Sequence, residues 1–296
     1  MTSLAIIGGG NMGGAIASAA AAAAQRTFDR VIVAETNAAK LAALVAGSDG
    51  RLEGSRSACD AIKAAGEDSV IVLAVKPQMF VTLAQELTQR GEEGVCRLRG
   101  QLVVSIMAGI TTARLAELLG SACSSPATRF VRAMPNLALA RGCGMTAVCA
   151  GPSATDADVE IVADLFRTMG EATRIEEPLM DAFTALAGSG PAYVFHLAEA
   201  MQRAAITLGF EAEVADRVVR QTILGAADLL AHEYGATGKG RSGERSASLL
   251  KAAVTSKGGT TEAALAVLDR RETAEALIEA ITAARDRGRE LARPAT

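Results

Sequence analysis

Short apolar runs alternate with helix-like segments over the first 175 residues of the chain. The runs that predict strands are Leu4–Ile7, Val31–Ala34, Val70–Val75, Leu102–Ile106, Arg129–Met134, Gly144–Ala150 and Glu171–Ile175. The segments that predict helices are 15–24, 38–45, 79–90, 111–119 and 153–169. Alternation of this kind indicates an α/β fold, in which a doubly wound, mainly parallel sheet is covered by helices on both faces. The near-continuous apolar strands agree, because buried parallel strands do not alternate between apolar and polar residues.

The pattern changes at Glu176-Glu177-Pro178, and nothing beyond it predicts a strand. We therefore expect two domains, one over residues 1–175 and an all-helical one over 176–296. The segment Phe183–Leu197 offers little polar surface, and a helix that is apolar all round is a buried one. Since a domain this small cannot bury many such helices by itself, the helical half is expected to form an intertwined homodimer core.

Composition excludes several classes of protein. Net charge is −3, with no run of Lys or Arg longer than two, which argues against nucleic-acid binding. No stretch reaches the roughly 18 apolar residues of a membrane span, and the start of the chain lacks a signal-peptide pattern. The five cysteines form no C-x-x-C pair and the two histidines have no zinc-type spacing. We expect a cytoplasmic protein with reduced thiols and no metal site.

A glycine loop follows the first predicted strand. Gly8, Gly10 and Gly13 fit the spacing G-x-G-x-x-G at the start of a helix, and Glu35 ends the next predicted strand. In dinucleotide-binding folds the first glycine permits the turn, the second lets pyrophosphate approach and the third lets helix and strand pack closely. The loop therefore predicts a Rossmann-type dinucleotide site. The alternative is that the glycines serve only a tight strand–helix turn.

Glu35 bears on which dinucleotide is bound. An acid at this position accepts hydrogen bonds from the adenosine ribose of NAD and repels a 2′-phosphate. Thr36, Asn37 and Lys40 follow at once and could still hold a phosphate. The protein is expected to accept NADH, and these residues do not exclude the use of NADPH.

A second candidate stretch, Ala74-Val75-Lys76-Pro77, closes a central strand. It lies at the carboxyl edge of the sheet, where ligands of doubly wound folds bind. Because Pro77 stops the strand, Lys76 and the backbone of Val75 are expected to face the crevice. A solvated lysine beside a turn proline is the alternative.

The stretch Val254–Glu262 lies between two helical segments and predicts a tight turn that opens a helix. Gly258 and Gly259 permit positive φ, and Thr260 or Thr261 is the expected N-cap. A helix start of this kind leaves backbone N–H groups free for a small anion such as a carboxylate, and hydroxyls flank it. A glycine-capped turn between helices is the alternative.

Together these motifs resemble those of the pyrroline-5-carboxylate reductase family along nearly the whole chain. The matching pieces are Gly-Gly-Gly-Asn-Met-Gly (8–13), Ala-Val-Lys-Pro (74–77), Arg-Ala-Met-Pro-Asn (132–136), Gly-Ser-Gly-Pro-Ala-Tyr (188–193) and Lys-Ala-Ala-Val-Thr-Ser-Lys-Gly-Gly-Thr-Thr (251–261). The last is the most specific.

The resemblance implies an activity and an assembly. Members of the family reduce the C=N bond of Δ1-pyrroline-5-carboxylate with NADPH or NADH and form L-proline, the last step of proline biosynthesis. They combine a Rossmann-type domain with a helical dimerisation domain, and many assemble further into decamers.

The resemblance also implies roles for individual residues. The cofactor would be held by Gly8, Gly10, Asn11, Met12, Gly13, Glu35, Ala74, Val75, Lys76 and Pro77. The substrate carboxylate would be held by the Ser256 hydroxyl and the amides of Gly258, Gly259, Thr260 and Thr261. Thr261 would also reach the ring nitrogen, and Thr261 and Ser256 are the expected catalytic residues. Glu244 would line the same pocket.

Some positions depart from the family pattern. Lys257 stands where the family often has proline, so the turn is less rigid and carries an extra cation. Leu137-Ala138 replaces the usual Thr-Pro after Asn136, and Ala247 and Ala252 replace a common proline and aspartate. None of these changes removes a group that the chemistry needs.

Two other classes of protein remain as alternatives. One is a different imine or hydroxyacid reductase with the same two-domain plan, which would ignore pyrroline-5-carboxylate. The other is a non-catalytic dinucleotide sensor, which has no evident need for the turn at Ser256–Thr261.

Overall fold

The computed structural model describes residues 3–23, 27–48, 50–88, 98–120, 123, 128–236 and 243–291. Eight strands form one sheet in the order β3-β2-β1-β4-β5-β6-β7-β8. Their bounds are β1 (Ser3–Ile7), β2 (Arg30–Ala34), β3 (Leu52–Ser55), β4 (Val70–Leu73), β5 (Leu102–Ser105), β6 (Arg129–Met134), β7 (Gly144–Ala150) and β8 (Gly170–Arg174). All neighbouring strands are parallel except β6 and β7, which pair antiparallel. The fold is therefore the predicted doubly wound sheet, with one antiparallel step.

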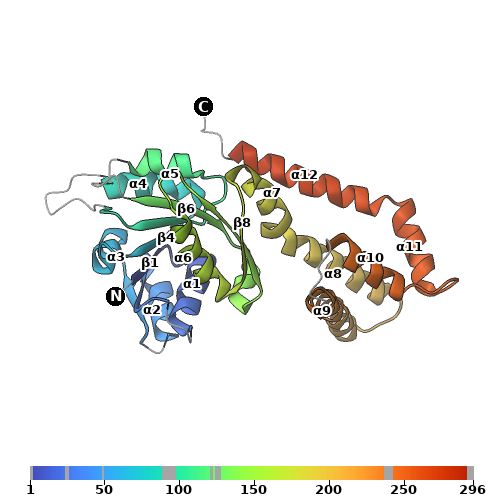
Figure 1. The fold of residues 1–296 in the computed structure, drawn as a ribbon. Coiled ribbons are helices and arrows are strands. Elements are labelled where there is room, and N and C mark those ends of the chain that lie inside the picture. Colours follow the sequence, from blue (N-terminus) through green and yellow to red (C-terminus); the bar gives the residue numbers. More distant parts are fainter. Residues whose placement is uncertain are drawn as a thin grey trace. The chain divides into compact units, whose positions relative to one another are not determined.

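Helices cover both faces of this sheet (Figure 1). They are α1 (Asn11–Ala22), α2 (Ala38–Ala46), α3 (Ala58–Ala65), α4 (Phe80–Thr88), α5 (Thr112–Leu119) and α6 (Asp156–Arg167). Leu4 and Ile6 of β1 pack in one apolar cluster with residues of α1 and α6. Their neighbours Ala5 and Ile7 pack in another with residues of α3, α4 and α5. The central strand is thus buried on both sides, as its unbroken apolar sequence requires.

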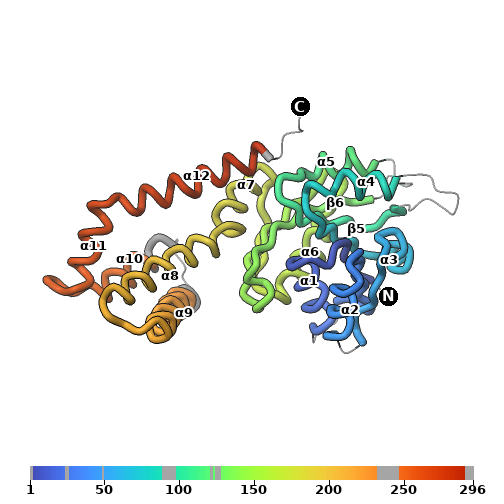
Figure 2. The backbone as a smooth tube through the Cα atoms, turned by 180° about the vertical axis from the view of Figure 1, so that it is seen from behind, coloured from blue at the N-terminus to red at the C-terminus, as the bar shows by residue number. Residues whose placement is uncertain are grey.

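The rest of the described chain, beyond β8, consists of helices joined by short turns. It comprises short turns, namely the 3₁₀ turn Glu177–Leu179, α7 (Met180–Phe183) and the π-helical turn Thr184–Gly188. Longer helices follow, namely α8 (Gly190–Thr207), α9 (Ala212–Ala236), α10 (Gly243–Ala253), α11 (Thr260–Arg270) and α12 (Thr273–Leu291). The path of these helices can be followed in Figure 2, where α9 and α10 lie against each other.

Backbone contacts divide the chain into two compact units. The first contains residues 1–191 and 282–296, and the second contains Ala192–Ile281. Within the described residues, no helix is long and apolar enough to cross a membrane, and no cluster of three or more metal-ligating side chains occurs.

Two expectations about local structure were incomplete or wrong, and a third is not tested by a single chain. The sequence pattern missed β3 and α3, because β3 reads Leu-Glu-Gly-Ser and buries only Leu52. The strand expected to reach Val75 ends at Leu73. The segment Phe183–Leu197 exposes Leu186, Phe195 and Leu197 in the single chain, and its expected burial in a homodimer core stays a prediction.

Candidate functional site

The three glycines of the first loop have three different surroundings. Gly8 has φ +110°, and a Cβ there would lie 2.8 Å from the Ala74 carbonyl oxygen. A Cβ on Gly13 would collide with the Gly8 carbonyl oxygen. A Cβ on Gly10 would meet nothing within 4 Å. The outer two glycines are therefore required by chain packing, whereas Gly10 leaves open space above the loop.

The open space lies at the start of α1. Gly10 is the N-cap and makes no side-chain capping bond, while the Gly14 amide donates to the Gly10 carbonyl at 2.7 Å. The amides of Asn11, Met12 and Gly13 occupy the first turn, where a helix offers donors to an anion. The Met12 side chain packs against the core, so only its backbone serves this role. A glycine cradle with free amides fits the pyrophosphate of a dinucleotide.

A cleft of about 690 Å³ runs along the carboxyl ends of β1, β2, β3 and β4. Residues from both expected stretches line it, namely Gly8, Gly10, Glu35, Ala74, Val75 and Lys76. Pro77 starts a 3₁₀ turn (Pro77–Met79) directly after Lys76. Asn11 lines a smaller adjoining hollow with Gly9 and Gly10. The structure therefore brings together predicted cofactor residues that are about 65 positions apart in the chain.

Glu35 is tied to the turn that follows β2. Its Oε1 accepts a 2.8 Å hydrogen bond from the Asn37 amide and a longer one, 3.4 Å, from the Thr36 hydroxyl. The Asn37 side chain in turn caps α2 by accepting from the Lys40 amide. One carboxylate oxygen of Glu35 remains available for a ribose hydroxyl.

Arg56 lines the same end of the cleft and was not found from the sequence. Ala34 and Ser55 are register partners in β2 and β3, and the Glu35 amide donates to the Ser55 carbonyl at 3.0 Å. Arg56 therefore lies next to Glu35, and its Nη2 lies 3.4 Å from the Thr36 carbonyl oxygen. Ser57, which caps α3, was the sequence signal that could have placed Arg56 between a strand and a helix.

The second candidate site is the turn between α10 and α11, within the second unit. Gly258 has φ +73°, as a tight turn requires, whereas Gly259 has φ −86°. The N-cap of α11 is Gly259 and no side chain caps it. The prediction that Thr260 or Thr261 is the N-cap was therefore wrong. Both threonines belong to the first turn of the helix.

Two of the four amides expected to hold a carboxylate already have partners. The Gly258 amide donates to Glu262 Oε2 at 2.6 Å, and the Gly259 amide donates to the Ser256 carbonyl at 3.0 Å. The amides of Thr260 and Thr261 lie at the first two positions of α11, where intrahelical acceptors are absent. The Ser256 hydroxyl lies directly beside the Gly259 backbone. Donors for one small anion thus converge at the start of α11.

The other residues of this region have separate roles. The Thr255 hydroxyl donates to the Lys251 carbonyl at 2.6 Å, so it completes α10. Glu244 belongs to the first turn of α10, but its side chain lies outside the described part of the structure. Its expected place in the substrate pocket stays a prediction.

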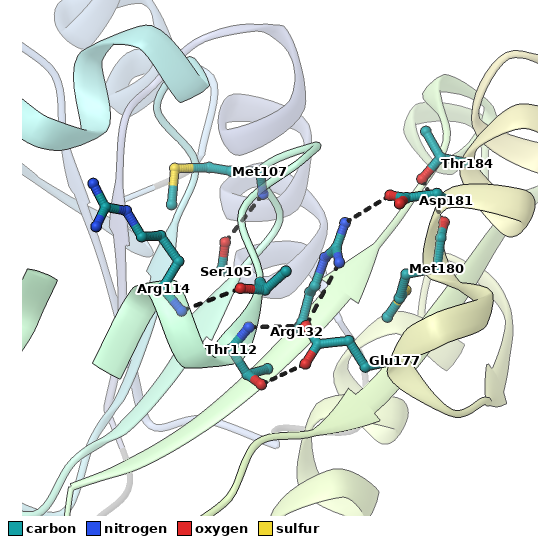
Figure 3. A network of polar contacts seen from close by, with 10 residues as sticks. Ser105, Met107, Thr112, Arg114, Arg132, Glu177, Met180, Asp181 and Thr184 are labelled. Atoms are coloured by element: carbon teal, nitrogen blue, oxygen red, sulfur yellow. Dashed lines mark hydrogen bonds and ion pairs between the residues drawn. The ribbon is translucent and has the colours of Figure 1, made fainter. Parts of the chain in front are cut away.

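Arg132, in the Arg-Ala-Met-Pro-Asn motif, is the centre of a buried polar network in the first unit (Figure 3). It is 2% exposed and faces Glu177 at 3.6 Å and Asp181 at 3.7 Å. Glu177 also accepts from the Thr112 amide at 2.8 Å and the Thr112 hydroxyl at 2.6 Å. Among the described residues, Nε and Nη2 of Arg132 have no hydrogen-bond acceptor. The network holds the chain that enters α7 against β6 and α5.

Asn136, from the same motif, orders the next segment. Its Nδ2 donates to the Ala187 carbonyl at 3.1 Å, and its Oδ1 accepts from the Met145 amide at 3.2 Å. Ala187 lies in the π-helical turn Thr184–Gly188, and this turn ends directly before Ser189. The motif therefore has a positioning role in the described structure. Cys149 is the register partner of Arg132 in the neighbouring strand β7. Burial, together with the negative charge of Glu177, raises the pKa of the Cys149 thiol to about 12.

Comparison with known proteins covers both units. Residues 3–109 match the family model described as NADP oxidoreductase coenzyme F420-dependent. Residues 177–291 match the model described as pyrroline-5-carboxylate reductase dimerisation. The two models fall on the glycine loop and cleft and on the turn at Ser256–Thr261, respectively.

Relatives match along almost the entire chain. The pyrroline-5-carboxylate reductase of Mycobacterium tuberculosis is 35% identical over 98% of this chain and 97% of its own length. A solved structure of the Coxiella burnetii enzyme is 31% identical, with a TM-score of 0.78 and 98% coverage of both chains. The Plasmodium falciparum enzyme, solved with NADP bound, shares the fold with a TM-score of 0.76 at 23% identity. The chain belongs to the pyrroline-5-carboxylate reductase family.

Proposed function

We propose that the chain reduces Δ1-pyrroline-5-carboxylate to L-proline with a hydride from NADPH or NADH. The observation that carries the proposal is the 35% identity to a reductase of this name over 98% of the chain. The glycine cradle and the anion-binding turn supply the two binding functions that such a reaction needs. A protein that only senses dinucleotides would have no use for the second.

The cofactor site is assigned to the cleft of the first unit. The amides of Asn11, Met12 and Gly13 bind the pyrophosphate, and Gly8 and Gly10 keep side chains out of its path. Glu35 accepts from the adenosine ribose. Ala74–Pro77 form the wall of the cleft beside Gly8, which a Cβ on that glycine would strike. When bound, the reduced nicotinamide supplies the hydride.

The substrate site is assigned to the turn before α11. The amides of Thr260 and Thr261 and the Ser256 hydroxyl bind the substrate carboxylate, with the positive end of the helix dipole favouring its charge. Gly258 and Gly259 shape this turn, and their amides hold it closed. Glu244 would line the same pocket.

Thr261 is assigned the contact to the substrate ring nitrogen. The C=N carbon accepts a hydride readily only when the nitrogen carries a proton, so a group that orients and stabilises the protonated imine lowers the barrier. A threonine hydroxyl is too weak an acid to supply that proton itself. Thr261 therefore acts by hydrogen bonding and by relaying a proton from water, while the carboxylate clamp fixes the substrate orientation.

The assembly is proposed to be a homodimer through the helical half, and a decamer at the next level. Residues 176–296 would form this helical domain and residues 1–175 the cofactor domain. The match to a dimerisation model over 177–291 supports this division. So do the large apolar side chains that α8 and the segment after it leave exposed in the single chain, including Val194, Phe195, Leu197, Ile206, Leu208 and Phe210. A cytoplasmic location is the matching expectation for such an enzyme.

The proposal is tested by initial rates of NADH and NADPH oxidation, each with and without pyrroline-5-carboxylate. We expect turnover that depends on the substrate. Cofactor binding without any turnover would overturn the assignment and favour a reductase of other imines.

Thr261→Ala tests the mechanism. We expect kcat/KM to fall roughly ten- to a thousandfold, the range for a lost polar contact to the transition state. Thr261→Ser should restore most of it, because the hydroxyl returns. Thr222→Ala is the matched control, since that hydroxyl only bonds the Val218 carbonyl within α9. Wild-type activity in Thr261→Ala would remove the hydroxyl from the mechanism.

A further inference from the structure

The adenosine end of the cofactor cleft carries more positive charge than the sequence pattern indicated. Side chains of Thr36, Lys40, Arg56 and Ser57 line it together with Glu35. Lys40 and Arg56 are both exposed, so their charged groups are available to a ligand. One carboxylate and two cations thus line this end of the cleft, at the place where an adenosine ribose would lie.

The position of Arg56 is fixed by the register of the sheet. Ser55 pairs with Ala34, which puts Arg56 beside Glu35 at the carboxyl ends of two neighbouring parallel strands. The guanidinium reaches over the turn after β2, with Nη2 3.4 Å from the Thr36 carbonyl oxygen. That bond is long, so the guanidinium can turn to a stronger acceptor at small cost. An arginine at this place is what a Rossmann fold uses to accept a 2′-phosphate.

The repulsion from Glu35 is reduced by its own hydrogen bonds. Oε1 is held at 2.8 Å by the Asn37 amide and faces the Thr36 hydroxyl, so part of its charge is compensated by the turn. Positive charge at this end of the cleft comes from Lys40, in the first turn of α2, and from Arg56. An arginine also offers two parallel N–H donors to a phosphate, which a single carboxylate cannot cancel.

We infer that Arg56, supported by Lys40, is the specificity-determining residue that lets this enzyme accept the 2′-phosphate of NADPH although Glu35 also permits NADH. The inference rests on the proposed function, because it deepens the cofactor site of that reaction. The enzyme then uses both cofactors, with the ratio set by the opposition of Arg56 and Glu35.

The test measures binding without turnover. The affinities of 2′,5′-ADP, which carries the 2′-phosphate, and of 5′-AMP, which lacks it, are measured by calorimetry on the full-length wild type and variants. We expect Arg56→Ala to weaken 2′,5′-ADP roughly ten- to a hundredfold, the range for a lost hydrogen bond to a charged group, and 5′-AMP much less. Glu35→Gln should strengthen 2′,5′-ADP, because the repulsion disappears while the acceptor for Asn37 is kept.

Arg51→Ala is the matched control, since Arg51 is an exposed arginine of the same region that does not line the cleft. Arg56→Lys keeps the charge without the paired donors, and an intermediate affinity is expected. Kinetics should follow, with the NADPH:NADH ratio of kcat/KM falling by a similar factor in Arg56→Ala. Equal weakening of both nucleotides, or of neither, would overturn the inference. A failure of the proposed function has a different signature, namely no turnover of pyrroline-5-carboxylate by a wild type that binds both nucleotides.

Discussion

Gly10→Ala separates the effect on cofactor binding from the effect on folding, because Gly10 has open space around it, unlike Gly8 and Gly13. A Cβ at position 10 meets nothing within 4 Å, and the backbone there (φ −66°, ψ −172°) is one that alanine adopts freely. Alanine is a poorer N-cap than glycine, but it also lowers the entropy of the unfolded chain. These effects nearly offset each other, so the free energy of unfolding should change by less than about 1 kcal/mol.

The same methyl group projects into the space through which a pyrophosphate would pass. Forcing a methyl into a filled site costs about 1–3 kcal/mol, which corresponds to a rise of about 5- to 150-fold in the dissociation constant. Since pyrophosphate is common to both cofactors, NADH and NADPH should weaken by the same factor. Unfolding is followed by circular dichroism in urea, and binding by the fluorescence of the reduced cofactor, which a chain without Trp does not obscure.

Two matched glycine variants complete this experiment. Gly13→Ala places a methyl against the Gly8 carbonyl, so it should lose both stability and binding. Gly225→Ala lies in α9, lines neither the cofactor cleft nor the hollow beside it, and places its Cβ where nothing lies within 4 Å, so cofactor affinity should not change. Wild-type cofactor affinity in Gly10→Ala would refute the path assigned to the pyrophosphate. A large loss of stability in Gly10→Ala would show that the loop has no room for a methyl group at this position.

Three further predictions concern assembly, the buried network and pH. Phe195→Glu puts a charge on an apolar side chain that is 60% exposed in the single chain, so sedimentation should find a monomer at micromolar concentration, and an unchanged dimer would contradict the proposed interface. Glu177→Ala leaves Arg132 with only Asp181 and should lower the free energy of unfolding by roughly 2–4 kcal/mol in urea, whereas a neutral effect would mean that the ion pair is dispensable. The Cys149 thiol keeps its proton in the folded state up to about pH 12, mainly because it is desolvated. Its contribution to stability is therefore complete below the ordinary thiol pKa of about 8.5 and is lost as the pH rises towards 12, so Cys149→Ala should flatten the alkaline fall in stability.

The fold could be predicted from the sequence because its central strands are unmistakable. Runs such as Val70–Leu73 have no polar residue, and only burial on both faces explains them. The edge strand β3 could not be predicted in the same way. β3 has one buried side chain, Leu52, and two exposed residues, so it leaves no apolar run to detect.

The same distinction applies to the candidate site: features within one short segment could be predicted, and features that depend on strand register could not. The glycine loop depends on spacing within one short segment, and its residues could be assigned directly. The proximity of Glu35 and Arg56 follows from the register between β2 and β3, which could not be known while β3 was missed. At the turn before α11 the motif predicted a substrate site, but it did not predict the hydrogen bonds of the turn, in which the Glu262 carboxylate reaches back four residues to the Gly258 amide. That bond supplies rigidity where Lys257 stands in place of the proline of related sequences.

Substitutions in the glycine loop and substitutions at the ends of β2 and β3 are expected to have different consequences. In the proposed cofactor site, backbone groups of the glycine loop would contact the part of the cofactor that NADH and NADPH share, so changes there should alter both affinities together. Side chains at the ends of β2 and β3 line the cleft where the proposed site would hold the part in which the cofactors differ, so changes at Glu35 or Arg56 should alter the ratio of the two affinities. Because an edge strand with little buried surface places few demands on its side chains, Arg56 can be exchanged at small cost to folding. The choice of cofactor can therefore vary within this fold while the loop that binds the pyrophosphate stays the same.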